Sequence, residues 1–393
     1  MKTAETRLQQ RRSDTGYGVP GGRGEFEPPC PVVVLLACAL AFGCGGTDEP
    51  QAPAASAAAL VDSQGVGVGD GARLVDREAF ADAFDVVRTL VLEEDERAIA
   101  VLPMVSSGGP GRFLVAEPRE GQVNVYGTDG RLWQVLGSRG EGPGEFMLPI
   151  SARRTSDGGI VVADMALSRL TFFPPGGGGE PEVVASPLPL VLGADDLGEG
   201  RYLLSGQLMS GTQPLLLHLW HRGSDRIEHS FLPMGVPERS RAYAASYTSV
   251  ATIPEGDTIW AVWALSDTVY KFNRRGERLA RIPLSLPRPM GVLPDAGAGV
   301  VTDPRAIQAD ADALTQVTGI FIAGDGYLAV QSMQSRGADA VWDLTIVDRW
   351  GAPVWKAAGM PRLFAVEEGL FYFDDFASIL PNRWIVARWK GEG

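Results

Sequence analysis

The sequence predicts an all-β fold, a six-bladed β-propeller that follows an N-terminal lipoprotein signal and a flexible linker. Three observations support this prediction. Glycine (49 residues) and proline (28 residues) are more frequent than in average proteins, which favours many turns and short strands. After residue 110, units of short apolar strands and tight turns recur. The cysteines, Cys30, Cys38 and Cys44, all precede these units, so we expect no disulfide within the propeller.

Composition and charge restrict the classes of function. With 393 residues, 45% hydrophobic and 21% charged, the chain has the composition of a globular protein. Its formal net charge is −13, and its Lys and Arg residues form no basic stripe. Binding to nucleic acid depends on clustered positive charge that displaces counterions. We therefore expect no nucleic-acid partner.

The first 43 residues are predicted to be a signal peptide. Residues 31–43 form an apolar run that is too short to cross a bilayer as a helix and has the length of a signal-peptide core. The run ends in LAFGC, residues 40–44, which resembles a bacterial lipobox. That resemblance implies lipidation of the Cys44 thiol after cleavage. The alternative is an ordinary secretory signal with an incidental cysteine.

Residues 44–80 are predicted to be the lipidated cysteine and a tether rich in Ala, Gly and Pro. A flexible chain of about 27 residues reaches on the order of 30 Å, which holds a domain close to a membrane surface. These features predict a lipid-anchored protein on the periplasmic side of a bacterial cell envelope. Gly45 stands where some bacteria place an Asp to retain lipoproteins in the inner membrane, so the outer membrane is favoured.

The repeated units span residues 81–393 and are predicted to be propeller blades. Their strands show period-two alternation of β-branched and aromatic residues, as in 123–135 and 269–282. Glycines in the predicted hairpin turns recur at intervals near fifty residues, with a wider last interval. Blades of a few antiparallel strands have this repeat length. The turn glycines are Gly130, Gly176, Gly223, Gly276 and Gly351.

Five turns and a C-terminal unit predict six blades, with seven as the alternative. The strand-like segment 86–94 has no blade of its own, so we expect it to complete the last blade beside 383–389. The wide interval before Gly351 indicates an insertion at about 286–317 that contains a short helix.

The stretch GEGPGEF, residues 140–146, closely resembles the connection between blades in NHL-repeat propellers. The resemblance extends through the preceding Asp129-Gly130 turn and the following strand that ends at Asp164. It implies a structural corner in which glycines permit positive φ, proline fixes one bend and phenylalanine fills the gap between two blades. A phosphate-binding loop is excluded because a strand follows, not a helix. The motif residues are Gly140, Gly142, Pro143, Gly144 and Phe146.

Candidate metal ligands are few. The histidines lie in one unit, so a zinc site that needs a histidine from several blades is excluded. Acidic residues end several predicted strands and suggest a polar ring at one rim, which either binds a divalent cation or caps strand ends. The histidines are His218, His221 and His229, and the weak metal-site candidates are Glu117, Asp164 and Asp374, with Gln331 at a comparable position.

Other polar and aromatic residues point to no particular chemistry. The asparagines Asn124, Asn273 and Asn382 are too scarce for a cation channel lined by amides. The tryptophans are expected either to fill blade cores or to line a binding groove. They are Trp220, Trp260, Trp263, Trp342, Trp355, Trp384 and Trp389.

No catalytic constellation accompanies the propeller pattern, which favours a non-enzymatic binding or scaffold module. Its partner is a protein or a small molecule, and we expect a monomer without a cofactor. The alternative is a metal-dependent hydrolase or lyase, similar to lactonases, that uses Glu117, Asp164 and Asp374 in the central channel. A third, weaker hypothesis is a sensor component within an envelope complex.

Overall fold

The computed structural model describes residues 75–391, apart from 97, 99–102, 211–212, 245–246, 294–308, 310–311, 325, 337–338 and 379. The predicted signal peptide, Cys44 and most of the tether therefore lie outside the described residues. In the described part of the chain, no helix is both long enough and apolar enough to span a membrane.

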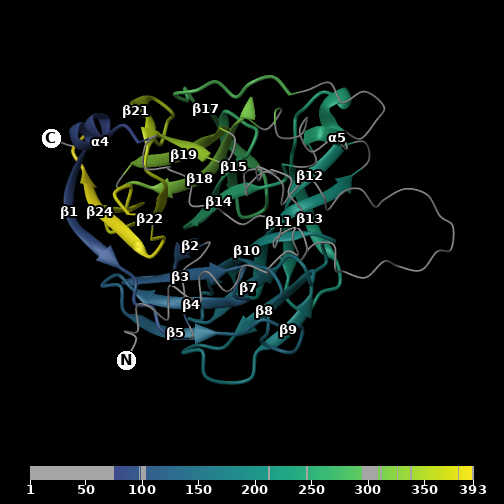
Figure 1. The fold of residues 1–393 in the computed structure, drawn as a ribbon. Helices are drawn as coiled ribbons and strands as arrows, with labels where there is room; N and C mark the ends of the chain where they lie inside the picture. Colours follow the sequence, from purple (N-terminus) through teal and green to yellow (C-terminus); the bar gives the residue numbers. More distant parts are fainter. Residues whose placement is uncertain are drawn as a thin grey trace, which may run out of the picture.

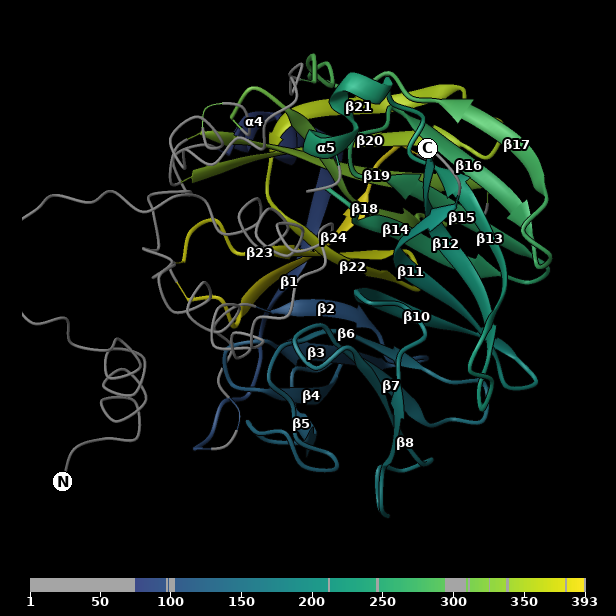
Figure 2. The same ribbon diagram turned by 90° about the vertical axis from the view of Figure 1, so that its right-hand side faces the viewer.

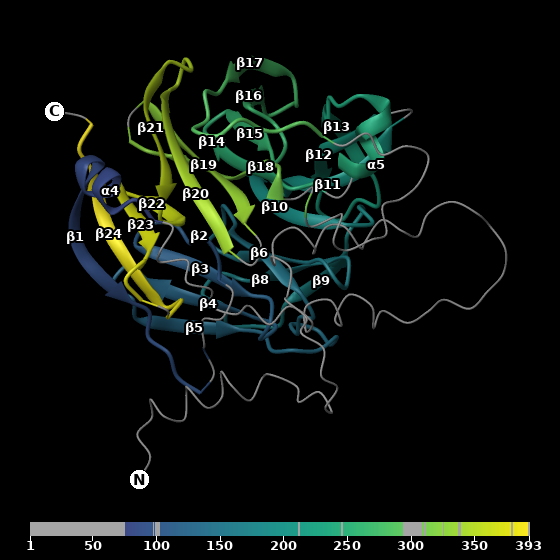
Figure 3. The same cartoon turned by 45° about the horizontal axis from the view of Figure 1, so that its top comes forward.

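Six four-stranded antiparallel sheets form the blades of a propeller, as predicted. Figure 1 shows the inner strands near the centre and β1, β5 and β17 at the periphery, and Figure 3 shows the same arrangement with the top tilted forward. Listed from the inside outward, blade 1 is β2 (Met104–Ser107), β3 (Arg112–Glu117), β4 (Gln122–Gly127) and β5 (Leu132–Leu136), and blade 2 is β6 (Pro149–Arg154), β7 (Ile160–Asp164), β8 (Arg169–Phe173) and β9 (Glu182–Ala185). Blade 3 is β10 (Val191–Gly198), β11 (Arg201–Ser210), β12 (Gln213–His221) and β13 (Ile227–Pro233), and blade 4 is β14 (Val250–Glu255), β15 (Thr258–Trp263), β16 (Thr268–Asn273) and β17 (Arg278–Pro283). Blade 5 is β18 (Thr315–Ile322), β19 (Tyr327–Arg336), β20 (Asp339–Asp348) and β21 (Pro353–Met360), and blade 6 is β22 (Leu363–Glu367), β23 (Leu370–Asp374), β24 (Arg383–Trp389) and β1 (Phe84–Val91).

Each blade has one more strand than the sequence pattern indicated. The repeated unit began at segments such as 112–117, which is β3, the second strand of its blade. The inner strands had no place in the pattern because they are short, rich in polar residues or irregular, so their alternation is weak. These inner strands surround the propeller axis, and they therefore line its channel.

The ring closes through β1, as predicted for segment 86–94. This strand pairs antiparallel with β24, from Phe84 opposite Trp389 to Val91 opposite Arg383. The first strand of the described chain thus completes the last blade, which confirms both the closure and the number of six blades. In Figure 2 the dark-blue β1 lies beside the yellow β24.

Two predicted boundaries are wrong. Helix α4 (Arg77–Ala83) occupies the end of the predicted tether, with the Asp76 side chain accepting a hydrogen bond from the Ala79 N–H at 3.0 Å. Phe80 is buried among aromatic residues of blade 6, so the folded domain begins before residue 81. The predicted insertion ends too late, because residues 315–317 belong to β18. Most of its predicted helix lies outside the described residues; two short helices elsewhere, η3 (Glu238–Ser240) and α5 (Arg241–Ala244), precede blade 4.

Apolar side chains pack between each pair of neighbouring blades, which gives six inter-blade cores around the ring. The core between blades 1 and 2 contains Leu114 and Val125 from the first blade and Val162 and Phe173 from the second. Burying such side chains stabilises the fold by about 1.5–3 kcal/mol each. Neighbouring blades therefore depend on each other for their stability.

The glycine-rich stretch connects β5 to β6 and so crosses from blade 1 to blade 2. Phe146 is fully buried in the core between them. Gly137 has φ of +77°, and a Cβ there would lie 2.4 Å from the Phe146 ring, so glycine permits both the conformation and the close approach.

The polar backbone groups of this stretch are satisfied within the protein. The Phe146 N–H donates to the Ser138 carbonyl at 2.8 Å, and the Gly142 N–H donates to the Glu145 carboxylate at 2.8 Å. Arg169 of β8 donates to the carbonyl oxygens of residues 141, 142 and 145 at 2.7, 2.9 and 2.7 Å. Because these N–H groups point to protein acceptors, the stretch has the geometry of a structural corner.

Candidate functional site

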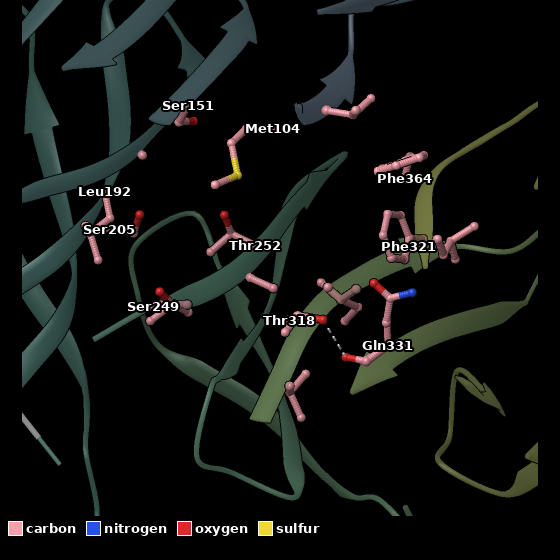
Figure 4. Close-up of a pocket in the computed structure, with 18 of the residues that line it drawn as sticks. Met104, Ser151, Leu192, Ser205, Ser249, Thr252, Thr318, Phe321, Gln331 and Phe364 are labelled. Carbon is pink, nitrogen blue, oxygen red and sulfur yellow. Dashed lines mark hydrogen bonds between the residues drawn. The ribbon is translucent and has the colours of Figure 1, made fainter. Parts of the chain in front are cut away.

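The central channel of the propeller contains a cavity of about 260 Å³ that is lined by the inner strands of all six blades. Figure 4 shows side chains from several blades converging on it. A single blade contributes only two to seven of the lining residues, so the site exists only in the closed ring. We regard this cavity as the candidate functional site.

Four inner strands bulge where they meet the cavity. In β6, β10, β18 and β22 one residue at the cavity interrupts the pairing with the second strand, so that two residues oppose one. Strand β10 has a second irregularity, at Leu197, which does not line the cavity. Bulges redirect side chains and are frequent near functional sites. The four extra residues, Ile150, Leu192, Thr318 and Phe364, all line the cavity.

One side of the cavity carries a hydrogen-bonded polar network. The Arg153 Nε atom lies 3.0 Å from the Asp195 carboxylate, and the Thr252 hydroxyl donates to the other carboxylate oxygen at 2.5 Å. These residues come from β6, β10 and β14, so the network joins three consecutive blades. They also line a second cavity, of about 330 Å³, which places the ion pair at the boundary between the two spaces. Both oxygens of Asp195 are therefore engaged.

The opposite side is aromatic and contains a second arginine. The guanidinium carbon of Arg362 lies 5.3 Å from the ring centre of Trp342 and 5.0 Å from that of Phe364. Phe321 of β18 completes this wall (Figure 4). Burial lowers the pKa of Arg362, while the negative charges of Asp374 and Glu117 oppose that shift. Arginine keeps its proton in proteins, so a cationic group faces the cavity.

The predicted carboxylates Glu117, Asp164 and Asp374 end the second strands of their blades, and none of them lines the cavity. Asp164 accepts hydrogen bonds from the N–H groups of Met147 at 2.8 Å and Leu148 at 3.1 Å, in the connection that leads into β6. It also accepts from the N–H groups of Ala166 at 3.1 Å and Leu167 at 3.2 Å, which caps the following turn. For this residue the structure supports the capping alternative.

The other two carboxylates have a shared neighbour. Glu117 and Asp374 both act electrostatically on Arg362. Burial raises the pKa of Asp374 to about 6, although the positive charge of Arg362 lowers it. Across the described ranges, no three His, Cys, Asp or Glu residues gather in a way that would hold a metal ion. The three carboxylates are thus not brought together into one centre.

Gln331, the fourth residue of the predicted polar ring, does line the cavity. With its amide oriented to match its neighbours, its nitrogen donates to the Leu363 carbonyl at 3.3 Å and its oxygen accepts from the Leu363 N–H. The side chain therefore ties blade 5 to the inner strand of blade 6.

The histidines do not form a metal site. His218 is fully buried in β12, with Nδ1 2.8 Å from the Ser230 hydroxyl and Nε2 3.2 Å from the Gly206 carbonyl. Because that carbonyl only accepts, Nε2 carries the proton and Nδ1 accepts from Ser230. Burial lowers the pKa of His218 to about 4. His221, three residues later, is exposed.

The tryptophans divide between the two predicted roles. Trp220, Trp260, Trp263 and Trp384 are buried in the blade cores, whereas Trp342 lines the cavity. Trp355 and Trp389 are partly buried against the core between blades 5 and 6.

The asparagines have structural partners. Asn124 accepts from Gln122 at 3.1 Å, Asn273 accepts from two turn N–H groups, and Asn382 donates to the Leu92 carbonyl at 3.3 Å beside the closing strand. These contacts account for the three asparagines as structural residues.

Sequence reasoning missed the residues that matter most in the cavity: Ser151, Arg153, Asp195 and Arg362. All of them lie on or next to inner strands, which the repeat pattern did not include. A signal was available. Three short strands with their turns leave roughly fifteen residues of each unit unassigned, and that is enough for a fourth strand of typical length.

Comparison with known proteins supports the fold. No family model and no curated relative matches the chain. Among solved structures, a protein of Bacteroides fragilis described as exported aligns with a TM-score of 0.57 at 12% identity, over 78% of this chain and 95% of that one. A member of the DUF4221 family from Bacteroides vulgatus aligns with a TM-score of 0.57 at 9% identity, over 78% of this chain and 97% of that one. At these identities the likeness concerns the fold.

Proposed function

We propose that this chain is an exported, lipid-anchored propeller that holds a ligand at the mouth of its central channel and catalyses no reaction. The observation that carries the proposal is the set of four bulges, which turn side chains from four blades into one cavity. Bulges of this kind are retained for a purpose, because each one interrupts the hydrogen-bonded ladder. The proposed activity requires no cofactor.

Two features support binding over catalysis. The cavity's own carboxylate, Asp195, is held by Arg153 and Thr252, so it is not positioned to transfer a proton. The carboxylates that the hydrolase or lyase alternative requires lie outside the cavity, and Asp164 is occupied by backbone N–H groups. No observation specifically favours that alternative.

Export and anchoring are proposed from the leader and from the structural likeness to one protein that is described as exported. The apolar run 31–43 is followed by Cys44 in a lipobox-like setting, and one structurally similar protein is described as exported. The NHL-like corner at residues 140–146 lies within the propeller, so it neither supports nor opposes export and anchoring.

The anchor is tested by the substitution Cys44→Ala in the full chain. We expect the variant to leave the membrane fraction, because one lipidated cysteine would be the whole attachment. Fractionation and immunoblotting of cells that produce either form would measure this. A variant that stays with the membrane in the same proportion as the unmodified chain would refute lipid anchoring.

Ligand binding is tested by filling the mouth of the channel. Ser249 is exposed and lines the cavity (Figure 4), so the substitution Ser249→Trp is expected to abolish retention of any bound small molecule. Mass spectrometry of molecules released by denaturing the purified full chain would detect the loss. The matched control is Ser156→Trp, at an exposed turn between β6 and β7 outside the cavity. Equal release from both variants, or none from the unmodified protein, would count against the proposal.

A further inference from the structure

Arg362 differs from the other arginine of the channel in how its charge is balanced. Arg153 is paired with Asp195 at 3.0 Å. Arg362 donates to the Pro103 carbonyl at 3.4 Å, a weak contact with a neutral acceptor. Among the residues that the structure describes, no carboxylate oxygen lies within 4.0 Å of its guanidinium. The guanidinium therefore retains donors for a further acceptor.

The aromatic neighbours stabilise this charge without neutralising it. Trp342 and Phe364 present their rings to the Arg362 guanidinium at 5.3 and 5.0 Å. Contacts between a cation and a ring of this kind are attractive and leave the net charge in place. A guanidinium group is planar and can donate two parallel hydrogen bonds to the two oxygens of a carboxylate.

The opposite wall offers an unused hydroxyl. Ser151 is only 7% exposed and lines the cavity, and its Oγ atom has no hydrogen-bond partner among the described residues. A buried hydroxyl without a partner is unfavourable, so its position in a cavity suggests that a bound molecule supplies the partner. Gly193 permits the Ser205 hydroxyl to approach the backbone beside Ser151, since a Cβ at residue 193 would lie 2.9 Å from the Ser205 hydroxyl and 3.6 Å from that of Ser151.

The two walls define a ligand with two chemical ends. Figure 4 shows Ser151, Ser205 and Ser249 on one side of the cavity and Phe321, Phe364 and Gln331 on the other. We infer that the channel binds a small molecule whose carboxylate contacts Arg362, whose apolar body lies against Phe321 and Phe364, and whose polar end reaches the hydroxyl of Ser151. This inference rests on the proposed binding function and names its ligand class.

Nearby acidic groups limit the affinity. Glu117 and Asp374 lie outside the cavity but act on Arg362, and Asp375 in turn acts on Asp374. Their negative charge opposes the approach of an anion, so a simple carboxylate should bind weakly. A ligand that also fills the apolar and hydroxyl-lined parts of the cavity should bind more tightly.

The experiment uses 4-fluorobenzoate as the probe and the full chain purified in detergent. Its carboxylate and ring match Arg362 and the aromatic wall, and broadening of its fluorine NMR signal reports binding directly. The neutral amide, 4-fluorobenzamide, is the matched probe without charge. We expect the benzoate to bind and the benzamide to bind at least about tenfold more weakly, as for loss of one charged hydrogen-bonded contact.

Three variants localise the binding. Arg362→Gln should weaken benzoate binding by about tenfold, while Arg226→Gln, at a residue whose side chain is 88% exposed in a surface turn, should leave it unchanged. Ser151→Ala removes a hydroxyl that has no protein partner, so it should leave the fold intact. The probes for this hydroxyl are 4-fluoro-2-hydroxybenzoate and similar hydroxylated benzoates. At least one of them should bind Ser151→Ala about threefold more weakly than it binds the unmodified protein.

Three results would overturn the inference: equal benzoate binding by the unmodified protein and Arg362→Gln, equal binding of benzamide and benzoate, or displacement by inorganic phosphate as effective as by unlabelled benzoate. If Arg362→Gln fails to fold, Arg362→Lys replaces it in the experiment. This variant keeps the positive charge, so it should still bind the benzoate more tightly than the benzamide. The proposed function is tested separately. It fails if denatured Ser249→Trp and Ser156→Trp release equal amounts of bound small molecule. Benzamide binding without benzoate binding would leave ligand retention intact and refute the anionic class alone.

Discussion

A chain that begins at Leu92, and so lacks both α4 and β1, is expected to lose the single cooperative unfolding transition of the complete propeller. Removing β1 deletes the outer strand of blade 6, including its full antiparallel pairing with β24. Phe84 and Leu90 are 2% and 4% exposed, and their burial alone is worth about 3–6 kcal/mol. A typical domain is stable by only about 5–15 kcal/mol. Calorimetry or denaturant titration would measure the effect.

The matched control for this truncation begins at residue 75. It keeps α4, β1 and every described contact between blade 6 and blade 1. We expect this shorter chain to unfold in one transition near the midpoint of the full chain. If the two truncated chains unfold alike, closure by β1 does not hold the ring together.

Lowering the pH from 7 to 4 is expected to destabilise the protein through His218 by about 3 kcal/mol. The pKa of this buried ring is lowered to about 4 in the folded state, against 6.5 as its model value. Between these values the unfolded chain binds a proton that the folded chain does not. The contribution to stability is therefore complete above pH 6.5 and is lost as the pH falls towards 4.

The substitution His218→Asn removes this titrating group, so the free energy of unfolding should depend less steeply on pH between 6.5 and 4. The quantity compared is the difference in free energy of unfolding between the variant and the unmodified protein at each pH. Asp374, whose pKa is raised to about 6, has the opposite effect, and taking the difference removes it. Gln213→Asn, at an exposed position of the same strand, exchanges no titrating group and is the control. Parallel curves for His218→Asn and the unmodified protein would contradict the assignment.

The parts of the fold that could be predicted are those with a local chemical signal. Alternating residues in 123–135 and the turn glycine Gly130 indicate a hairpin, and β4 and β5 form it. Segment 86–94 is strand-like without a neighbouring hairpin partner, and it pairs across the ring with β24. The start of the domain was misplaced because α4 is a seven-residue helix whose packing on blade 6 no local pattern reveals.

The candidate site was harder to predict. Acidic residues at strand ends are visible in a sequence, but only the structure shows that Asp164 caps a loop and that Glu117 and Asp374 flank Arg362. Gln331 was grouped with these carboxylates in the sequence, whereas in the structure it lines the cavity and its amide pairs with the backbone of the next blade.

The sequence by itself determined the six repeated units, the closing strand and the corner at residues 140–146, because alternation, turn glycines and a buried aromatic act over short distances along the chain. Only the tertiary structure decided what lines the channel. Arg153, Asp195 and Thr252 are separated by 42 and 57 residues along the chain, and Pro103 and Arg362 by 259. Their contacts arise because closing the ring brings the inner strands of all six blades around one axis, and no local pattern specifies that meeting.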